Sequence, residues 1–504
     1  MIQPIHTFFS SFRFLGASLL IAGMNLHPAT AQNTDYPAED IDQFFDTYLK
    51  TQKGTFQNDL PIELNQTRDA QAAVWASWVK ANKNFEEDSL ISLEDLSKAK
   101  DGSWKLPQNL EPKAVMNYFY GSKGKRPEQG YPFFVYMHGS GPRDYEWSNG
   151  LALCQSFKDS PSLYFIPQIP NEGQYYRWWQ KSKQFAWEKL LRMSFVEGEI
   201  DPNRIYFFGI SEGGYGSQRL ASFYADYLAG AGPMAGGEPL INAPVENCCN
   251  LAFTLRTGAE DEGFFRNVIT GYANNAFNEL EKQNPGHFVH KIEVIPGYGH
   301  GIDYRPTTPW LSQYTRNPHP KKVMWENYPM DGLKRKGFYN LYIEKEPLPA
   351  RDIRVYYTLD IEDNHINLDI QKVNYKTIES RGGIDILFSR TYSNIYRGMI
   401  RIYLNDKLID MNKPVTITAN GKLRYEGMVT PNLNDMVNSC ARFYDPERVF
   451  PASVLVDLSK VWTGIEEVET DNDEEEIFYD LSGRKVAHPE KGIYISNKGQ
   501  KVQF

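Results

Sequence analysis

The sequence predicts an α/β fold, a mostly parallel sheet flanked by helices, followed by a β-sandwich-like domain and a small C-terminal β module. Three observations lead to this prediction. Apolar, strand-like runs alternate with helical patterns between residues 114 and 336. From about residue 337 short alternating strands with turn residues replace the helical patterns. An acidic run at residues 464–476 then separates a last strand-like stretch, 477–504.

The composition describes a folded protein with more than one domain. The chain has 504 residues, of which 41% are hydrophobic and 23% charged. The net charge of the chain is -9, and the run 464–476 contains eight acidic residues and no basic one, so the rest of the chain is close to neutral. A near-neutral body gives no reason to expect nucleic acid or an anionic membrane as partner, and the acidic run reads as a solvated linker.

The N-terminus has the pattern of a secretory signal peptide over residues 1–31. Arg13 precedes an apolar stretch at 14–24, and Ala29-Thr30-Ala31 fits a cleavage site before Gln32. We therefore expect export to the periplasm, the cell surface or the medium, and no later stretch is apolar enough to span a membrane. Residues 32–113, with amphipathic helix patterns, are expected to form an N-terminal helical extension.

Four cysteines bear on the expectation of export, because an oxidising compartment permits disulfides. They allow three pairings if all are bridged, and a bridge from Cys154 to Cys248 or Cys249 is favoured over one to Cys440. The adjacent pair has neither the spacing of a redox motif nor that of a zinc site. No metal site is expected.

The sequence G-I-S-E-G at residues 209–213 matches the G-x-S-x-G pattern of a nucleophile held on a strand-to-helix turn. It follows the strand-like run 204–208, and further glycines open a helical pattern behind it. Ser211 is the candidate nucleophile. An ordinary strand-to-helix turn is the alternative interpretation, and the residues described next weigh against it.

A glycine-rich loop follows the apolar run 131–137, which is typical of a buried strand. In His138-Gly139-Ser140-Gly141 the small residues allow backbone N–H groups to face a reacting carbonyl. Together with the amide of Glu212, the amides of Gly139, Ser140 and Gly141 are the candidate oxyanion hole. For His138 we prefer a structural role in the loop.

The candidate acid and base follow later strands. Asp261 comes after the strand-like run 251–257, where a carboxylate could orient a histidine, with Glu260 as the alternative. His300 lies on a glycine-flanked loop after the strand 290–295 and is the candidate general base. His287 and His290 are rivals, but they precede or begin that strand and are expected at its far end.

An aromatic segment follows the strand-like run 163–169. Tyr175, Tyr176, Trp178 and Trp179 surround one arginine at the carboxyl end of that strand, where ligands bind in α/β sheets. These rings could stack on a sugar or aromatic substrate. Equally, they could pack beneath a loop.

With these motifs in order, residues 114–331 resemble an α/β-hydrolase of the secreted esterase group that includes polyester depolymerases and feruloyl esterases. The resemblance rests on the elbow at 209–213, the loop at 138–141, Asp261 and His300. It implies acyl transfer through a Ser-His-Asp triad without a metal or organic cofactor. A departure is Ser140 within the oxyanion loop, which leaves open which amide donates there.

The C-terminal tail resembles the small sorting modules of type IX secretion, on the blocks D-L-S-G-R-K-V and G-I-Y-I within 477–504. This resemblance implies secretion machinery as a partner. A small sheet without a transport role is the alternative. The expected domains are therefore a signal peptide (1–31), the helical extension (32–113), the catalytic domain (114–336), the accessory β-sandwich (337–463), the linker (464–476) and the tail (477–504).

The expected function is that of a secreted serine hydrolase that cleaves carboxylic esters, with acylated glycans or small molecules as substrates. Two alternatives remain open. A prolyl-oligopeptidase-like peptidase would use the same triad, although the chain has no room for the N-terminal propeller of that family. A glycan-binding protein on an inactive hydrolase scaffold is the other. The accessory domain could bind glycan or brace the catalytic domain, and bracing is the preferred interpretation.

Overall fold

A computed structural model describes residues 36–85 and 89–460 and, after them, four short strands. The strands are β20 (Phe478–Tyr479), β21 (Lys485–Val486), β22 (Ile493–Ser496) and β23 (Lys501–Gln503), paired antiparallel in the order β21-β20-β22-β23. The signal peptide expected at 1–31 and the linker expected at 464–476 lie outside the described residues. The secretion role expected for the tail stays a prediction.

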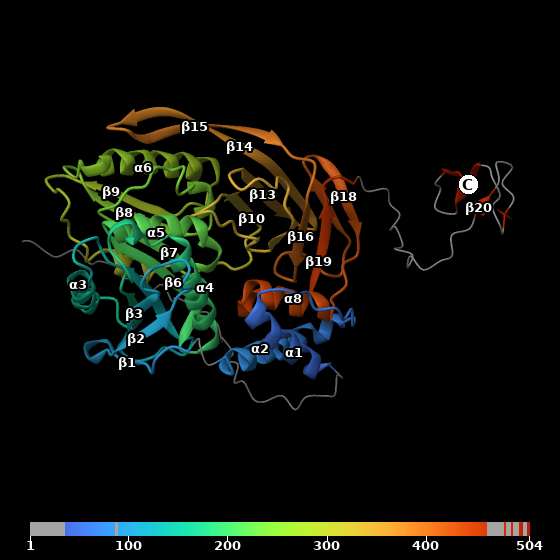
Figure 1. Cartoon of the computed structure of the whole chain (residues 1–504), viewed down its shortest axis with the longest axis horizontal. Coiled ribbons are helices and arrows are strands. Elements are labelled where there is room, and N and C mark those ends of the chain that lie inside the picture. Colours follow the sequence, from blue (N-terminus) through green and yellow to red (C-terminus); the bar gives the residue numbers. More distant parts are fainter. Residues whose placement is uncertain are drawn as a thin grey trace, which may run out of the picture.

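A nine-stranded sheet forms the centre of the larger α/β part (Figure 1). Its order is β1-β3-β5-β4-β6-β7-β8-β9, with β2 paired to β3; all strands from β5 to β9 run parallel, and β3 lies antiparallel to β5. This order, with β1 and β3 at the first edge antiparallel to the strands from β5 to β9, is that of an α/β-hydrolase fold, so the predicted fold class is confirmed. The strands are β1 (Glu94–Asp95), β2 (Asp101–Lys105), β3 (Val115–Lys123), β4 (Tyr131–Met137), β5 (Ser162–Pro167), β6 (Ile200–Ile210), β7 (Gly230–Met234), β8 (Ala252–Gly258) and β9 (His290–Ile295).

Helices cover both faces of this sheet, as a parallel sheet requires. Every residue of β4 is buried, and apolar side chains pack in two separate clusters around the central strands. The continuous apolar run 131–137 of the sequence therefore reflects a strand without a solvent face. The helices are α3 (Arg143–Ser156), α4 (Lys181–Val196), α5 (Glu212–Phe223), α6 (Arg266–Gln283) and α7 (Thr307–Leu311).

Two further sheets enclose a second apolar core and form the predicted β-sandwich-like domain. The six-stranded sheet contains β10 (Lys322–Asn327), β13 (Arg354–Glu362), β14 (His365–Arg381), β15 (Ile384–Asn394), β17 (Val415–Ala419) and β18 (Lys422–Gly427). The four-stranded sheet contains β11 (Gly337–Phe338), β12 (Leu341–Lys345), β16 (Met399–Leu404) and β19 (Ala452–Asp457). A helix absent from the prediction, α8 (Leu433–Phe443), accompanies them.

Pairing of the strands corrects two predicted boundaries. Residues 322–327 fall in the range expected for the catalytic domain, 114–336, but they form β10, which pairs with β13 and belongs to the sandwich. Residues 94–105 fall in the range expected for the helical extension, 32–113, but they contain the strands β1 and β2, which pair with β3 and enlarge the α/β sheet. Local patterns cannot assign a strand to a sheet, because only its pairing partner decides this.

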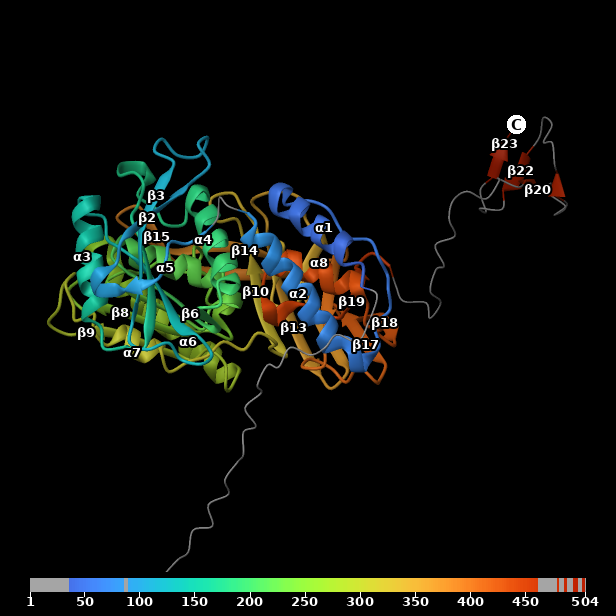
Figure 2. The same cartoon turned by 90° about the horizontal axis from the view of Figure 1, so that it is seen from below.

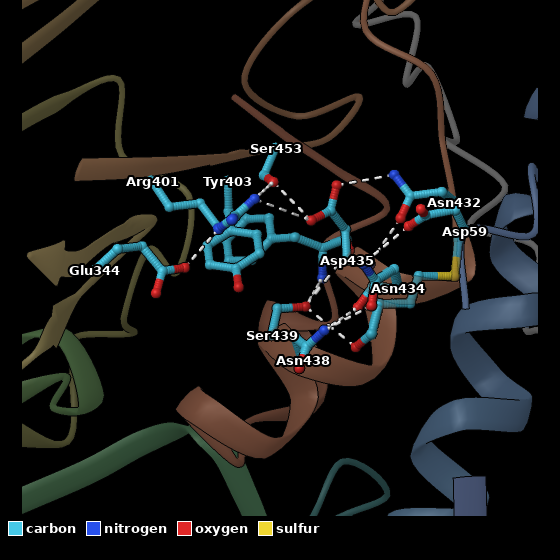
Figure 3. A network of polar contacts seen from close by, with 12 residues as sticks. Asp59, Glu344, Arg401, Tyr403, Asn432, Asn434, Asp435, Asn438, Ser439 and Ser453 are labelled. Atoms are coloured by element: carbon cyan, nitrogen blue, oxygen red, sulfur yellow. Dashed lines mark hydrogen bonds and ion pairs between the residues drawn. The ribbon is translucent and has the colours of Figure 1, made fainter. Parts of the chain in front are cut away.

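The N-terminal helices α1 (Ala38–Thr51) and α2 (Thr67–Lys83) pack beside α8 (Figure 2) and share an apolar cluster with it. Polar contacts around α8 strengthen this attachment (Figure 3). Asn434 on α8 donates to Asp59 at 3.0 Å, and Asp435 accepts from the Ser453 hydroxyl at 2.6 Å. The N-terminal segment is thus fastened to the sandwich.

The hairpin of β14 and β15 reaches from the sandwich over α6 of the α/β part (Figure 1). There the Tyr272 hydroxyl of α6 contacts the Glu379 carboxylate of β14. The second domain therefore touches a helix that follows one of the loops of the candidate site.

The four cysteines are all buried and free, so the expected bridge from Cys154 to Cys248 or Cys249 is wrong. Burial in apolar surroundings raises the pKa of each thiol, which keeps the thiols protonated and unreactive. Among the described residues, no helix combines the length and hydropathy needed to cross a bilayer.

Candidate active site

Ser211 occupies a strained turn between β6 and α5. Its backbone adopts φ 55° and ψ −113°, a conformation that residues with a Cβ rarely adopt and that costs about 1–3 kcal/mol. Glycines on both sides permit the turn: a Cβ on Gly213 would lie 1.9 Å from the Met137 carbonyl oxygen, and one on Gly209 2.4 Å from that of Gly213. The pattern G-x-S-x-G follows from these close approaches, and it presents Ser211 at the carboxyl end of the sheet.

His300 and Asp261 converge on this serine from two neighbouring strand ends. His300 Nε2 lies 3.0 Å from Ser211 Oγ, and His300 Nδ1 lies 2.8 Å from Asp261 Oδ2. Asp261 follows β8 and is 3% exposed, whereas the side chain of His300 follows β9 and is 46% exposed. This chain of hydrogen bonds joins a serine hydroxyl to an imidazole and the imidazole to a buried carboxylate. Such an arrangement can activate the hydroxyl as a nucleophile.

The alternative acid and bases lie elsewhere. Glu260 is exposed, and its backbone N–H donates to the Tyr298 carbonyl. Its carboxylate makes no hydrogen bond to His300, whose Nδ1 contacts Asp261. His287 contacts Asn250, and His290 contacts the Phe288 carbonyl at the start of β9. Geometry thus brings together the three preferred residues and separates their rivals from the serine.

Arg266 is a residue of this site that the sequence reasoning missed. It begins α6 and donates from Nε and Nη2 to Asp261 Oδ1, the oxygen that His300 leaves free. Burial alone would raise the pKa of Asp261, but the hydrogen bonds from Arg266 and His300 outweigh it and lower that pKa. Arg266 follows Asp261 after four intervening residues, a spacing without a signature in the sequence.

The loop after β4 passes close to Ser211. A Cβ on Gly139 would lie 3.4 Å from Ser211 Cβ, and one on Gly141 2.2 Å from a carboxylate oxygen of Glu146. The Tyr176 hydroxyl lies within hydrogen-bond distance of the Gly139 and Gly141 carbonyls. Because a trans peptide points its C=O and N–H in opposite directions, the Ser140 N–H points away from Tyr176.

His138 is buried and shapes this loop. Its Nε2 accepts from the Ile169 N–H at 3.1 Å, and its Nδ1 lies 2.8 Å from the Gly139 carbonyl, to which it donates. Burial lowers the pKa of His138 to about 4, so the ring is neutral. The predicted structural role of His138 is confirmed by these contacts.

Two of the four aromatic residues expected to form a stacking surface cannot do so. Trp178 is 0% exposed and Tyr176 is 3% exposed, so neither ring offers a face to a substrate. Trp178 Nε1 donates to the His138 carbonyl at 3.0 Å, and a Cβ on Gly216 would lie 2.5 Å from Trp178 Cβ. The expectation is therefore wrong for these two residues. Tyr176 packs against the glycine-rich loop, and Trp178 lies between that loop and α5.

The other two, Tyr175 and Trp179, remain partly exposed. The guanidinium of Arg219 lies 3.9 Å from the ring centroid of Trp179, and the guanidinium of Arg177 lies 5.9 Å from the same centroid. Arg177 also contacts Glu212 Oε2 at 3.2 Å. These side chains form a polar wall beside the residue that follows the serine.

Glu212 carries a buried carboxylate directly after Ser211. Only 9% of its side chain is exposed, and Oε1 has no hydrogen-bond partner. Burial is the main cause that raises the pKa of Glu212 to about 7, and the nearby Arg177 opposes it. Across the described part of the chain, no three or more His, Cys, Asp or Glu side chains are grouped to hold a metal ion.

Comparison with known proteins gives partial structural likenesses. No family model matches the chain, and no curated protein matches it by sequence. A thermostable esterase is 20% identical with a TM-score of 0.33, over 44% of this chain and 64% of that one. The BES protein from Bacillus cereus is 15% identical (TM-score 0.32, 44% and 98% covered), and a ferulic acid esterase is 14% identical (TM-score 0.31, 43% and 98% covered). At these values the likenesses do not extend to activity or substrate.

Proposed function

We propose that the protein is a serine hydrolase that cleaves carboxylic esters through Ser211, His300 and Asp261. One observation carries the proposal: a single imidazole contacts the serine hydroxyl with Nε2 and a buried carboxylate with Nδ1, and the serine stands on a strained turn between strand and helix. This arrangement supplies a nucleophile, a general base and an orienting group in hydrogen-bond contact.

In the first step Ser211 Oγ attacks the ester carbonyl carbon while its proton passes to His300 Nε2. The tetrahedral intermediate collapses when the imidazolium returns this proton to the departing alcohol, which leaves an acyl group on Ser211. A water molecule then gives a proton to His300 and attacks the acyl carbon. Collapse of the second intermediate releases the carboxylic acid and restores the serine hydroxyl. Asp261 holds the tautomer with a proton on Nδ1 throughout.

Backbone amides would stabilise the negative oxygen of each intermediate. The Glu212 N–H is the first of α5 and has no acceptor within the helix, and the positive end of the helix lies there. The Ser140 N–H, turned away from Tyr176, is the proposed second donor. Flanking Gly139 and Gly141 serve to bring this peptide close to the serine.

Acylated glycans are the proposed substrates, and this choice now rests on Tyr175 and Trp179 alone. Both rings are partly exposed and could stack on a sugar or an aromatic acid, and Trp179 lies beside Arg177, which contacts the residue after the serine. Export, and delivery through the C-terminal tail, remain predictions from the sequence.

The first test replaces Ser211 with alanine and measures hydrolysis of 4-nitrophenyl acetate. We expect kcat to fall by a factor of at least about 10³ with an unchanged Tm, because removal of a triad member is costly and loses little volume. Ser217→Ala is the matched control: Ser217 is a buried serine of α5, the helix that follows Ser211, and its hydroxyl donates to the Gly214 carbonyl. Activity of Ser211→Ala within about tenfold of the wild type would exclude Ser211.

A substrate screen separates the proposal from its alternatives. Acetylated and feruloylated glycans, polyesters and prolyl peptides would be offered to the wild type and to Ser211→Ala. Serine-dependent cleavage of esters but not peptides supports the proposal. Cleavage of peptides favours a peptidase, and glycan binding without any cleavage favours a binding protein.

A further inference from the structure

The Asp261 carboxylate is shared between a base and a cation. Oδ2 accepts from His300 Nδ1 at 2.8 Å, and Oδ1 accepts from Arg266 Nε at 2.9 Å and from Nη2 in a second, short contact. Asp261 is 3% exposed and Arg266 8% exposed. A carboxylate bound on both oxygens cannot rotate without losing one set of hydrogen bonds.

Arg266 also reaches back to the helix that begins after the serine. Its Nη1 donates to the Tyr215 hydroxyl at 3.0 Å, and the Tyr215 N–H donates to the Ser211 carbonyl at 3.0 Å. Hydrogen bonds therefore close a ring from Ser211 through Tyr215, Arg266, Asp261 and His300 back to Ser211. Within this ring Arg266 joins the loop after β8 to the first turn of α5.

The backbone before Arg266 is held in an unusual conformation. Phe264 (φ 54°) and Phe265 (φ 59°) both lie in the left-handed region, which is unfavourable for residues with a Cβ. The tip of the β14–β15 hairpin packs there: a Cβ on Gly382 would lie 3.3 Å from the Phe265 ring. Contact from the second domain thus supports the turn that starts α6 at Arg266.

We propose that Arg266 is a positioning residue that fixes Asp261 and, through it, sets the orientation of the catalytic histidine. The proposal rests on the proposed function. By occupying Oδ1, Arg266 leaves Oδ2 as the oxygen that faces the imidazole. Its positive charge also lies against the carboxylate that contacts His300, so its removal should alter the pH dependence of the reaction.

Other ionisable groups surround the same pair. Tyr215 approaches from α5, and Tyr304 approaches from the segment after β9, with its hydroxyl 3.4 Å from the His300 carbonyl. Behind these tyrosines lie Glu238 and Glu146. None of these four groups donates a hydrogen bond to the Asp261 carboxylate, so among the described residues Arg266 is the cation that bonds to it beside His300.

The test compares Arg266→Gln and Arg266→Lys with the wild type, using 4-nitrophenyl acetate between pH 5 and 9. For Arg266→Gln we expect kcat to fall about 10- to 100-fold with KM within threefold, because a small misplacement of a catalytic group acts on the reaction step. The acid limb of the kcat/KM profile should move to higher pH by about one unit, because a nearby cation is lost. Arg266→Lys, which keeps the charge, should return the acid limb to its wild-type position while restoring kcat only in part.

Arg256→Gln is the matched control, because Arg256 on β8 is another buried arginine, paired with Glu293 on β9. We expect it to lower Tm without moving the acid limb. An acid limb that stays in place in Arg266→Gln, with a loss of Tm like that of the control, would overturn the proposal. If Arg266→Gln does not fold, a wild-type pH profile together with wild-type kcat in Arg266→Lys would overturn it as well.

Ser211→Ala in the same assay separates the two proposals. If it is inactive and the profile of Arg266→Gln is unchanged, only the role of Arg266 fails. If Ser211→Ala is active, the proposed function fails and the role of Arg266 falls with it.

Discussion

Two clusters of aspartate and arginine in this protein use the same chemistry for different ends. The first lies between the domains: Arg448 contacts Asp226 and Asp445, and Arg335 and Arg316 complete the cluster. All of these side chains are at most 9% exposed. The second is the chain from Arg266 through Asp261 to His300.

The difference lies in where each chain of contacts ends. In the first cluster both carboxylates are surrounded by arginines, which lower the pKa of Asp226 and Asp445 against the effect of burial. Every carboxylate of this cluster is bonded to arginine, so the cluster joins the two domains. The second ends on a half-exposed imidazole that touches a hydroxyl. A buried acid–arginine pair becomes useful for catalysis when one carboxylate oxygen is left for a group that can exchange a proton.

The largest expected effect tests the second cluster, from Arg266 through Asp261 to His300, which we call the open cluster because it ends on a half-exposed imidazole. Asp261→Asn should lower kcat by about 10³- to 10⁴-fold, because an amide cannot hold the imidazole tautomer or stabilise the imidazolium. Its Tm should also fall, since the buried Arg266 loses its partner. Glu260→Gln, at an exposed site, should leave both quantities unchanged. Kinetics with 4-nitrophenyl acetate and thermal unfolding measure the two effects, and the reverse ranking of the two variants would move the acid by one residue.

The first cluster, which we call the closed cluster because its carboxylates are paired with arginines, should affect stability alone. Arg448→Met leaves two buried carboxylates short of a partner and should lower the free energy of unfolding by about 3–5 kcal/mol. The kcat of the folded variant should stay within twofold, because Asp226 follows the far end of α5, about 20 Å from Ser211 at a rise of 1.5 Å per residue.

Urea unfolding and kcat at low temperature measure this difference. Arg401→Met is the control, since the pair of Arg401 with Glu344 is partly exposed and should contribute at most about 1 kcal/mol. A large loss of kcat in Arg448→Met would show that the closed cluster also acts on the site.

The smallest expected effect concerns Glu212, which is buried like the closed cluster but incompletely paired. Its pKa is raised from 4.5 to about 7, so between these values the folded protein keeps a proton that the unfolded chain has lost. Stability contributed by this protonated form is therefore lost as the pH rises through this window. Glu212→Gln removes the effect, and its Tm relative to wild type should rise from pH 4.5 to pH 8, equivalent to about 1–3 kcal/mol.

Thermal unfolding at several pH values measures this trend, with Glu260→Gln as the exposed control. A difference in Tm that is constant with pH would contradict the raised pKa of Glu212.

Local signals in the sequence were sufficient for the fold class and for the elements that carry the site. Strand β4 begins and ends where the apolar run 131–137 does, because a strand buried on both faces must be apolar throughout. Strand β9 matches the expected strand 290–295, although it lies at the edge of the sheet and is only partly buried. The glycines around Ser211 mark the elbow because backbone atoms approach them within contact distance. Asp261 and His300 could be selected because each directly follows a strand of a parallel sheet, whose carboxyl ends share one edge.

Tertiary structure decided what local patterns cannot encode. Tyr176 and Trp178 have the composition of a stacking surface, yet packing against the glycine-rich loop and α5 buries them. Strand β10 joined the sandwich because of its pairing with β13, far along the chain. Arg266 became part of the site because the turn before α6 aims its guanidinium at Asp261. In each case the deciding contact joins segments or side chains whose relative position depends on the folded backbone, so a pattern of residue types along the chain could not reveal it.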